Sequence, residues 1–185
     1  MNEKKKSSAR ERQDPLRERY KEKPEEARIT DRAIATGGDD TDPFHGVIRP
    51  GSQDYGVSWR FGIHRAVGGH HDAPNPGDLL CAALAACLDS TIRIIANRLG
   101  VTLAGLEVEV TGEVDVRGTL MVGRNVPVGF KKMHCRVDIQ TVEGTNPKLV
   151  ETLLAASENS CVNMQTLRSG VPIETTVNKT FRSLV

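Results

Sequence analysis

The chain has 185 residues, a length that suits one domain with an appendage and that can bury a core without covalent cross-links. Its 25 lysines and arginines nearly balance its 24 aspartates and glutamates, so no overall field would recruit nucleic acid or an anionic membrane. The four cysteines form neither a Cys-x-x-Cys motif nor a zinc-ligand spacing, so we expect no disulfide framework, no structural metal and a reducing, cytoplasmic location.

Residues 1–28 form a charged segment with few apolar side chains. Leu16 and Tyr20 are the only large ones after Met1, so this segment cannot pack a core by itself. We predict a partly disordered N-terminal arm that favours a helix over residues 15–23, followed by one folded domain over residues 29–185. No secretory signal is visible at the start of the chain, and no apolar run reaches about 18 residues, so we expect no membrane span.

The first half of the domain contains two predicted strands and one long predicted helix. Residues 29–36 and 55–63 are rich in β-branched and aromatic side chains, which favour strands, and a glycine-rich loop follows at 66–75. A helix is predicted over residues 76–99. Pro76 suits its first turn, Asp78 places a negative charge near its positive end, and Gly100 follows as a stop signal.

The second half alternates strand and helix patterns in groups. Apolar residues recur at every second position over 106–116 and 133–139, which predicts two half-buried strands. Helices are predicted from residue 146 to about 160 and from Cys161 to Gly170, the second with Ser160 as its N-cap. A last strand is predicted over 171–177. Strands grouped in this way favour an α+β fold with antiparallel sheets.

Two of the four cysteines lie where thiol chemistry is plausible. Cys87 is on the apolar stripe of the long helix among small alanines, a position that also fits a buried structural cysteine. Cys161 opens a helix, where unpaired N–H groups and the helix dipole lower a thiol pKa provided that burial is not deep. Cys81, on another helix face, and Cys135, in a strand, are best explained as small hydrophobic residues.

Other site chemistries find little support. His64, His70 and His71 lie close together, but neighbouring histidines on a glycine-rich loop point in different directions and no cysteine or carboxylate cluster completes a ligand set. We therefore expect no metal and no cofactor. No phosphate-binding loop with its lysine and no Gly-x-Ser-x-Gly elbow occurs, which argues against nucleotide and serine-hydrolase functions.

An ordered set of motifs carries a family resemblance over residues 55–177. It comprises Tyr55-Gly56-Val57-Ser58-Trp59-Arg60-Phe61, then Asn75-Pro76-Gly77-Asp78-Leu79-Leu80 with Cys87 nine residues after Asp78, then Arg117-Gly118, and finally Cys161 at a helix start. Together these motifs resemble the osmotically inducible protein C and organic hydroperoxide resistance (OsmC/Ohr) family, in its broader OsmC-like branch.

The resemblance implies an intertwined homodimer in which antiparallel sheets wrap around long central helices. It also implies an antioxidant thiol peroxidase that reduces small organic hydroperoxides. Cys87 matches the peroxidatic cysteine, Cys161 the resolving cysteine and Arg60 the arginine that holds the thiolate, while Asp78 falls where the family carries a glutamate that orients this arginine. A Cys87 sulfenic acid and a Cys87–Cys161 disulfide would be intermediates, and a dithiol reductant such as a lipoyl group would reopen the bridge.

Two alternatives stay open at this point. Arg32 and Arg65 are alternative holders of the thiolate, because one sequence does not determine strand register. The whole chain is alternatively a non-enzymatic binder of an apolar ligand or a redox sensor on the same dimeric fold, because a fold does not by itself determine a function. Sustained peroxide consumption with a dithiol separates the two functions.

Overall fold

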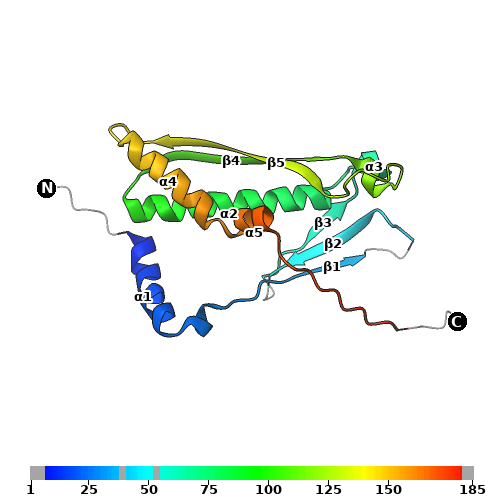
Figure 1. Ribbon diagram of the computed structural model, residues 1–185, viewed down its shortest axis with the longest axis horizontal. Coiled ribbons are helices and arrows are strands. Elements are labelled where there is room, and N and C mark those ends of the chain that lie inside the picture. The colour runs from blue at the N-terminus through cyan, green and yellow to red at the C-terminus, as the bar shows by residue number, and fades with distance from the viewer. Residues whose placement is uncertain (1–6, 38–40, 52–54, 181–185) are drawn as a thin grey trace.

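The computed structural model describes residues 7–37, 41–51 and 55–180. Its elements, shown in Figure 1, follow the chain in this order: α1 (Ser8–Glu22), η1 (Pro24–Ala27), β1 (Ala33–Gly37), β2 (His45–Pro50), β3 (Trp59–Gly62), η2 (Arg65–Val67), α2 (Pro76–Leu99), β4 (Leu103–Val114), α3 (Val116–Thr119), β5 (Phe130–Thr141), α4 (Pro147–Ser160) and α5 (Val162–Ser169).

The strands form two separate antiparallel sheets. One has three strands in the order β1-β2-β3, and the other is the long β4–β5 hairpin, in which Val110 lies opposite Cys135. In Figure 1 the hairpin runs along α2, α4 and α5 lie beside the same helix, and the three-stranded sheet lies near the N-terminal end of α2. This arrangement confirms the predicted α+β fold with antiparallel sheets.

The hydrophobic core is built around α2. Leu84, Leu88, Ile92 and Ala96 recur every four residues, so they form one buried stripe on the helix. The stripe packs with buried residues from the α4–α5 region, and the apolar side chains of β4 and β5 cover it as half-buried neighbours. The buried residues from outside α2 are Val101, Leu153, Cys161 and Met164.

Local signals determine both ends of α2, and the predicted bounds 76–99 are confirmed. The Asn75 side chain accepts hydrogen bonds from the N–H groups of Gly77 and Asp78, and the Asp78 carboxylate accepts one from the Asn75 N–H, which completes a capping box. At the other end Gly100 has φ of 75°, a left-handed conformation that glycine adopts without strain.

Other predicted boundaries need correction. The strand predicted over 55–63 is shorter, at Trp59–Gly62, and the first strand is Ala33–Gly37 rather than 29–36. Strand β2 was not predicted, because Gly46 and Pro50 weaken its strand signal. Gly46 has a packing role, since a Cβ there would lie 2.5 Å from the Phe61 ring on the neighbouring strand.

The C-terminal predictions also differ from the structure. The strand predicted over 171–177 is wrong for the single chain, in which residues 170–180 carry no regular structure. The reason is physical, because a strand needs a paired neighbour for its backbone hydrogen bonds. Ser160 is not the N-cap of α5 but the last residue of α4, and Cys161 itself lies between the two helices.

The N-terminal arm contains a helix longer than the predicted 15–23. Helix α1 begins at Ser8 with Ser7 as its N-cap, and none of its residues is buried. Its first half lies against the C-terminal end of α2 through polar contacts, among them Ala9 N–H to Asn97 Oδ1 at 2.9 Å and Arg10 Nε to the Arg98 carbonyl at 2.8 Å.

Helix α2 is both long and largely apolar. Asp89 and Arg93 interrupt its apolar sequence, so no unbroken run reaches about 18 residues, but the helix is long and apolar enough to cross a membrane by length and composition alone. The core helix of a globular protein passes the same test. In the single chain only four of its 24 residues are buried, so much of its apolar surface lies outside the core.

Candidate functional site

The central feature of the site is the pairing of Cys87 with Cys161. Cys87 projects from the middle of α2 and is half-buried, whereas Cys161, at the junction of α4 and α5, is completely buried. Both cysteines are free thiols, and the Cys161 thiol donates a hydrogen bond to Cys87. The structure therefore brings together the two cysteines that the sequence singled out, although 74 residues separate them in the chain.

The two thiols differ in their environments. Burial is the main cause that raises the pKa of the Cys161 thiol above its ordinary value, and the hydrogen bond and charge of Cys87 raise it further. Hydrogen bonds from the N–H groups of Met164 and Asn163 oppose this shift but do not outweigh it. The lowered pKa was predicted for Cys161 on condition that its burial is not deep. This condition is not met, and Cys161 is the protonated partner of the more accessible Cys87.

Polar contacts hold the two helices that carry the pair. Asn163 Nδ2, in the first turn of α5, donates to the Ala83 carbonyl of α2 at 2.8 Å, one helical turn before Cys87. On the other side of Cys87, the Thr91 hydroxyl donates to the Cys87 carbonyl at 2.7 Å. The Asn163 contact joins α5 to α2 close to the thiol pair, whereas the Thr91 contact lies within α2.

Arg60 and Asp78 lie apart from each other in the single chain. The exposed Arg60 side chain pairs through Nη2 with Asp72 Oδ2 at 3.2 Å. The Asp78 carboxylate instead accepts hydrogen bonds from the Asn75 N–H at 2.9 Å and from Asn75 Nδ2 at 2.6 Å. Within the described ranges no ion pair joins Arg60 to Asp78, and the alternative cations Arg32 and Arg65 are both exposed.

Asp72 belongs to a polar cluster that the sequence analysis missed. His45 lies between two carboxylates, with Nδ1 2.6 Å from Asp42 Oδ2 and Nε2 2.8 Å from Asp72 Oδ1, and its ring stacks on His70 at 5.6 Å between centroids. Hydrogen bonds to Asp72 and Asp42 raise the pKa of His45, and the same contact with His45 lowers the pKa of Asp72.

No local signal in the sequence points to this cluster. His45 and Asp72 are 27 residues apart in the chain, and the tertiary structure, in which β2 pairs with β3, brings them together. Asp72 then contacts His45 through one carboxylate oxygen and Arg60 through the other, so it connects the strand that carries Arg60 with the loop before α2.

A cavity near the site has a volume of about 1280 Å³ and lies between η2, the first turns of α2 and strand β4. Its walls are mainly apolar, and Cys81 is part of them, as are Ile63, Ala85 and Val110. Across the part of the chain that the structure describes, no group of three or more His, Cys, Asp or Glu side chains is arranged to hold a metal ion.

Two antiparallel sheets, a long central helix and a thiol pair thus define an α+β protein with a candidate redox site. The model of one protein family, described as OsmC-like protein, matches residues 69–176, which is more than half of the chain. The chain therefore belongs to the OsmC-like family, as the sequence motifs indicated. A search of curated proteins finds none that matches it.

Solved structures share the fold at low sequence identity. An OsmC-like protein from Mycoplasma pneumoniae has a TM-score of 0.60 and 15% identity, over 77% of this chain and 89% of its own. An organic hydroperoxide resistance protein OsmC from Legionella pneumophila has a TM-score of 0.55 and 24% identity, over 76% and 90%. An OsmC-like protein of unknown function from Vibrio cholerae has a TM-score of 0.62 and 13% identity, over 75% and 94%.

Proposed function

We propose that this protein is a two-cysteine peroxidase that reduces small organic hydroperoxides with electrons from a dithiol. The hydrogen-bonded pair of Cys87 and Cys161, with its unequal exposure, is the observation that carries the proposal. A nucleophile must reach its substrate, and Cys87 is the accessible member. A resolving cysteine must lie next to the first one and be less accessible to the peroxide, which fits the buried Cys161, and its thiol loses its proton when it attacks the oxidised Cys87.

The proposed reaction has three balanced steps. Cys87 attacks one peroxide oxygen, the O–O bond breaks, the alcohol leaves, and Cys87 becomes a sulfenic acid. The Cys161 thiol then attacks this sulfur, an S–S bond forms and water leaves. A dithiol such as a reduced lipoyl group finally exchanges with the disulfide, which returns both cysteines to thiols and leaves the reductant as a cyclic disulfide. The four free thiols suit a reducing compartment, so we place the reaction in the cytoplasm.

The proposal keeps Arg60 as the cation that favours the Cys87 thiolate and Asp78 as the carboxylate that orients it. In the single chain Arg60 is engaged with Asp72, and Asp78 is engaged with Asn75. Arg60 therefore reaches a thiolate by exchanging its partner during catalysis or across a subunit boundary. Its exposed side chain is free to make such an exchange.

We further propose that the protein acts as an intertwined homodimer. All five residues of β1 are exposed, and α2 leaves Leu80 and Ile94 exposed despite its apolar composition. Val171, Ile173 and Val177 alternate along the extended C-terminal segment and are all exposed. A second copy would cover these surfaces and offer the segment a strand to pair with. Light scattering coupled to gel filtration tests this assembly, and a monomeric mass would contradict it.

The experiment that tests the reaction is peroxide consumption over many turnovers with cumene hydroperoxide and dihydrolipoamide. Cys87→Ser should abolish turnover, and Cys161→Ser should also abolish it while Cys87 becomes overoxidised. Cys81→Ser, on the same helix but outside the pair, is the matched control and should keep most of the activity. Absence of turnover in the intact protein with several organic peroxides and dithiols would overturn the proposal.

One observation favours a second function, the binding of an apolar ligand without turnover. The cavity of about 1280 Å³ is mainly apolar and large enough for a small molecule, and its lining includes Cys81 but not Cys87. An apolar fluorescent probe that binds with equal affinity to the intact protein and to Cys87→Ser, with no peroxide turnover in either, would support this alternative.

A further inference from the structure

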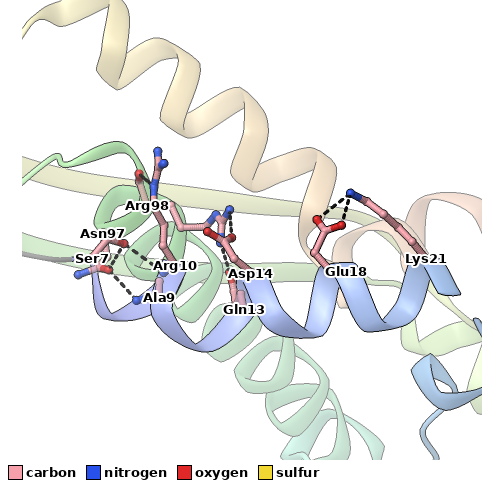
Figure 2. A network of polar contacts seen from close by, with 9 residues as sticks. All are labelled: Ser7, Ala9, Arg10, Gln13, Asp14, Glu18, Lys21, Asn97 and Arg98. Atoms are coloured by element: carbon pink, nitrogen blue, oxygen red, sulfur yellow. Dashed lines mark hydrogen bonds and ion pairs between the residues drawn. The ribbon is translucent and has the colours of Figure 1, made fainter. Parts of the chain in front are cut away.

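A network of polar contacts, drawn in Figure 2, attaches helix α1 to α2. The Asn97 side-chain oxygen accepts hydrogen bonds from the Ser7 hydroxyl at 2.8 Å and from the Ala9 N–H at 2.9 Å. Arg98 pairs with Asp14 of α1 at 2.8 Å. These contacts join the first half of α1 to the last turn of α2, so the position of α1 is defined although none of its residues is buried.

Packing within the single chain contributes little to α1. A helix of 15 residues is marginal in water and gains most of its stability by packing one face against other elements. Leu16, the one large aliphatic side chain of α1, is nevertheless 41% exposed. The residues that follow the helix are covered even less, since every residue from 27 to 37 is exposed and Ile29 is 81% exposed. The apolar side chains of the arm therefore remain largely uncovered in the single chain.

A hollow of about 510 Å³ separates α1 from the C-terminal half of α2. The two helices line it with Arg10, Gln13, Arg17, Ile94, Ile95 and Leu99. Ile94 belongs to the exposed apolar face of α2 that a second copy covers in the proposed homodimer. Because Ile94 and Arg17 line the same hollow, a chain that covers Ile94 also lies against α1. An apolar centre with arginines beside it is typical of protein interfaces.

The arm also extends along the side of the molecule on which this face lies open. Figure 1 shows α1 and the β1–β3 sheet on the same side of α2, opposite the β4–β5 hairpin. Residues 28–32 join η1 to β1 across this side. Exposed apolar side chains occur along the whole path, with Leu16 on α1, Ile29 in the connecting segment and Ile34 on β1. Exposed apolar side chains that gather on one side of a protein mark an interaction surface.

We propose that the N-terminal arm is part of the homodimer interface, and that α1 and residues 28–32 of each chain pack against the second copy. The inference rests on the proposed homodimer and not on the peroxidase chemistry. It goes beyond that assembly, because α1 and residues 28–32 lie outside the residues 69–176 that the OsmC-like family model matches. In a dimer with two-fold symmetry each arm contact occurs twice, so the arm strengthens the association from both ends.

Subunit exchange tests the proposal on the full-length protein. Ordinary and heavy-nitrogen-labelled protein are mixed, and native mass spectrometry follows the mixed dimers, whose rate of formation reports dimer dissociation. Ile29→Gln should speed the exchange about ten-fold, because each dimer loses two apolar contacts. The fold should be unchanged, since Ile29 is exposed in the single chain, and circular dichroism checks this. Arg12→Gln, at an exposed position of α1 outside the hollow, is the control and should leave the rate unchanged.

Hydrogen exchange gives a second readout without a substitution in the arm. Ile94→Asp places a charge on the apolar face of α2 and should give a monomer. Amides of residues 28–32 should exchange at least about ten-fold more slowly in the intact protein than in this variant, because the second copy covers them.

Three results would overturn the proposal. One is an equal rate of subunit exchange in Ile29→Gln and the intact protein, and another is equal hydrogen exchange of residues 28–32 in the intact dimer and the monomeric variant. The third is the absence of any dimer, which would overturn the homodimer as well. Peroxide turnover enters none of these readouts, so failure of the peroxidase proposal remains a separate result.

Discussion

The middle of α2 and its N-terminal end are built in contrasting ways. Around Cys87 and Cys161 the contacts are apolar and buried, with Leu88, Ile92 and Leu153 among the completely enclosed side chains. The β1–β3 sheet, which carries Arg60, contributes no residue to this core and is tied to the loop before α2 by the partly exposed contacts of Asp72. Packing therefore positions the thiols, whereas ion pairs position the candidate arginine, and the two should respond differently to substitution, pH and salt.

The largest expected effect is a loss of stability in the buried core around the thiols. Leu153→Ala removes a side chain that is completely buried on α4 and leaves a cavity in the core that also contains Cys161, which should lower the free energy of unfolding by about 3 kcal/mol. Ile34→Ala on the exposed strand β1 should lower it by less than about 1 kcal/mol. Chemical denaturation of both variants measures the contrast, and equal losses would show that the sheet has a core of its own.

A smaller effect is expected at the capping box of α2. Asn75→Ala removes the side chain that accepts from Gly77 and Asp78, and the loss should be about 1 kcal/mol in denaturant titrations. The same variant frees the Asp78 carboxylate from its Asn75 Nδ2 contact. If Asp78 orients Arg60 in the working enzyme, Asn75→Ala should keep its turnover despite lower stability. If Asn75→Ala instead lost as much turnover as Asp78→Ala, the role of Asp78 would be to cap α2 rather than to orient Arg60.

Local signals explain which parts of the fold could be predicted. Asn75, Pro76 and Gly100 act within one turn of the helix ends, so the bounds of α2 were available from the sequence. The alternation of β4 and β5 was likewise visible because each strand has one face on the core. The C-terminal segment 171–177 shows the same alternation, yet it has no regular structure, because alternation reports a buried face only when a neighbouring strand is present.

The candidate site was predictable in part for the same reason. Cys87 and Cys161 could be selected from their helix positions and from family motifs, but the burial of Cys161 depends on how α4 and α5 meet α2, which no local pattern reports. Burial then reverses the pKa shift that the helix start favours. The contact between Asp72 and His45 could not be predicted from the sequence. It depends on strand β2, whose glycine and proline weaken its strand signal.

The weakest expected effect is at the exposed cluster, and it depends on pH. The raised pKa of His45 means that its ion pairs stabilise the fold fully below about 6.5, the ordinary histidine value, and that this contribution is lost as the pH rises through the higher folded value. The lowered pKa of Asp72 sets the lower pH limit of this stabilisation. Its contribution is present above about 3.9, the ordinary aspartate value, and is lost as the pH falls through the folded value.

His45→Gln should therefore reduce stability most between about pH 4 and 6.5, and the difference from the intact protein should shrink towards pH 9. Thermal unfolding across this range measures the difference. His134→Gln, a histidine of β5 outside the cluster, is the matched control and should show no such window. A constant difference at all pH values would mean that His45 acts through packing on His70 rather than through its charge. That result would contradict the interpretation that ion pairs, rather than packing, position Arg60.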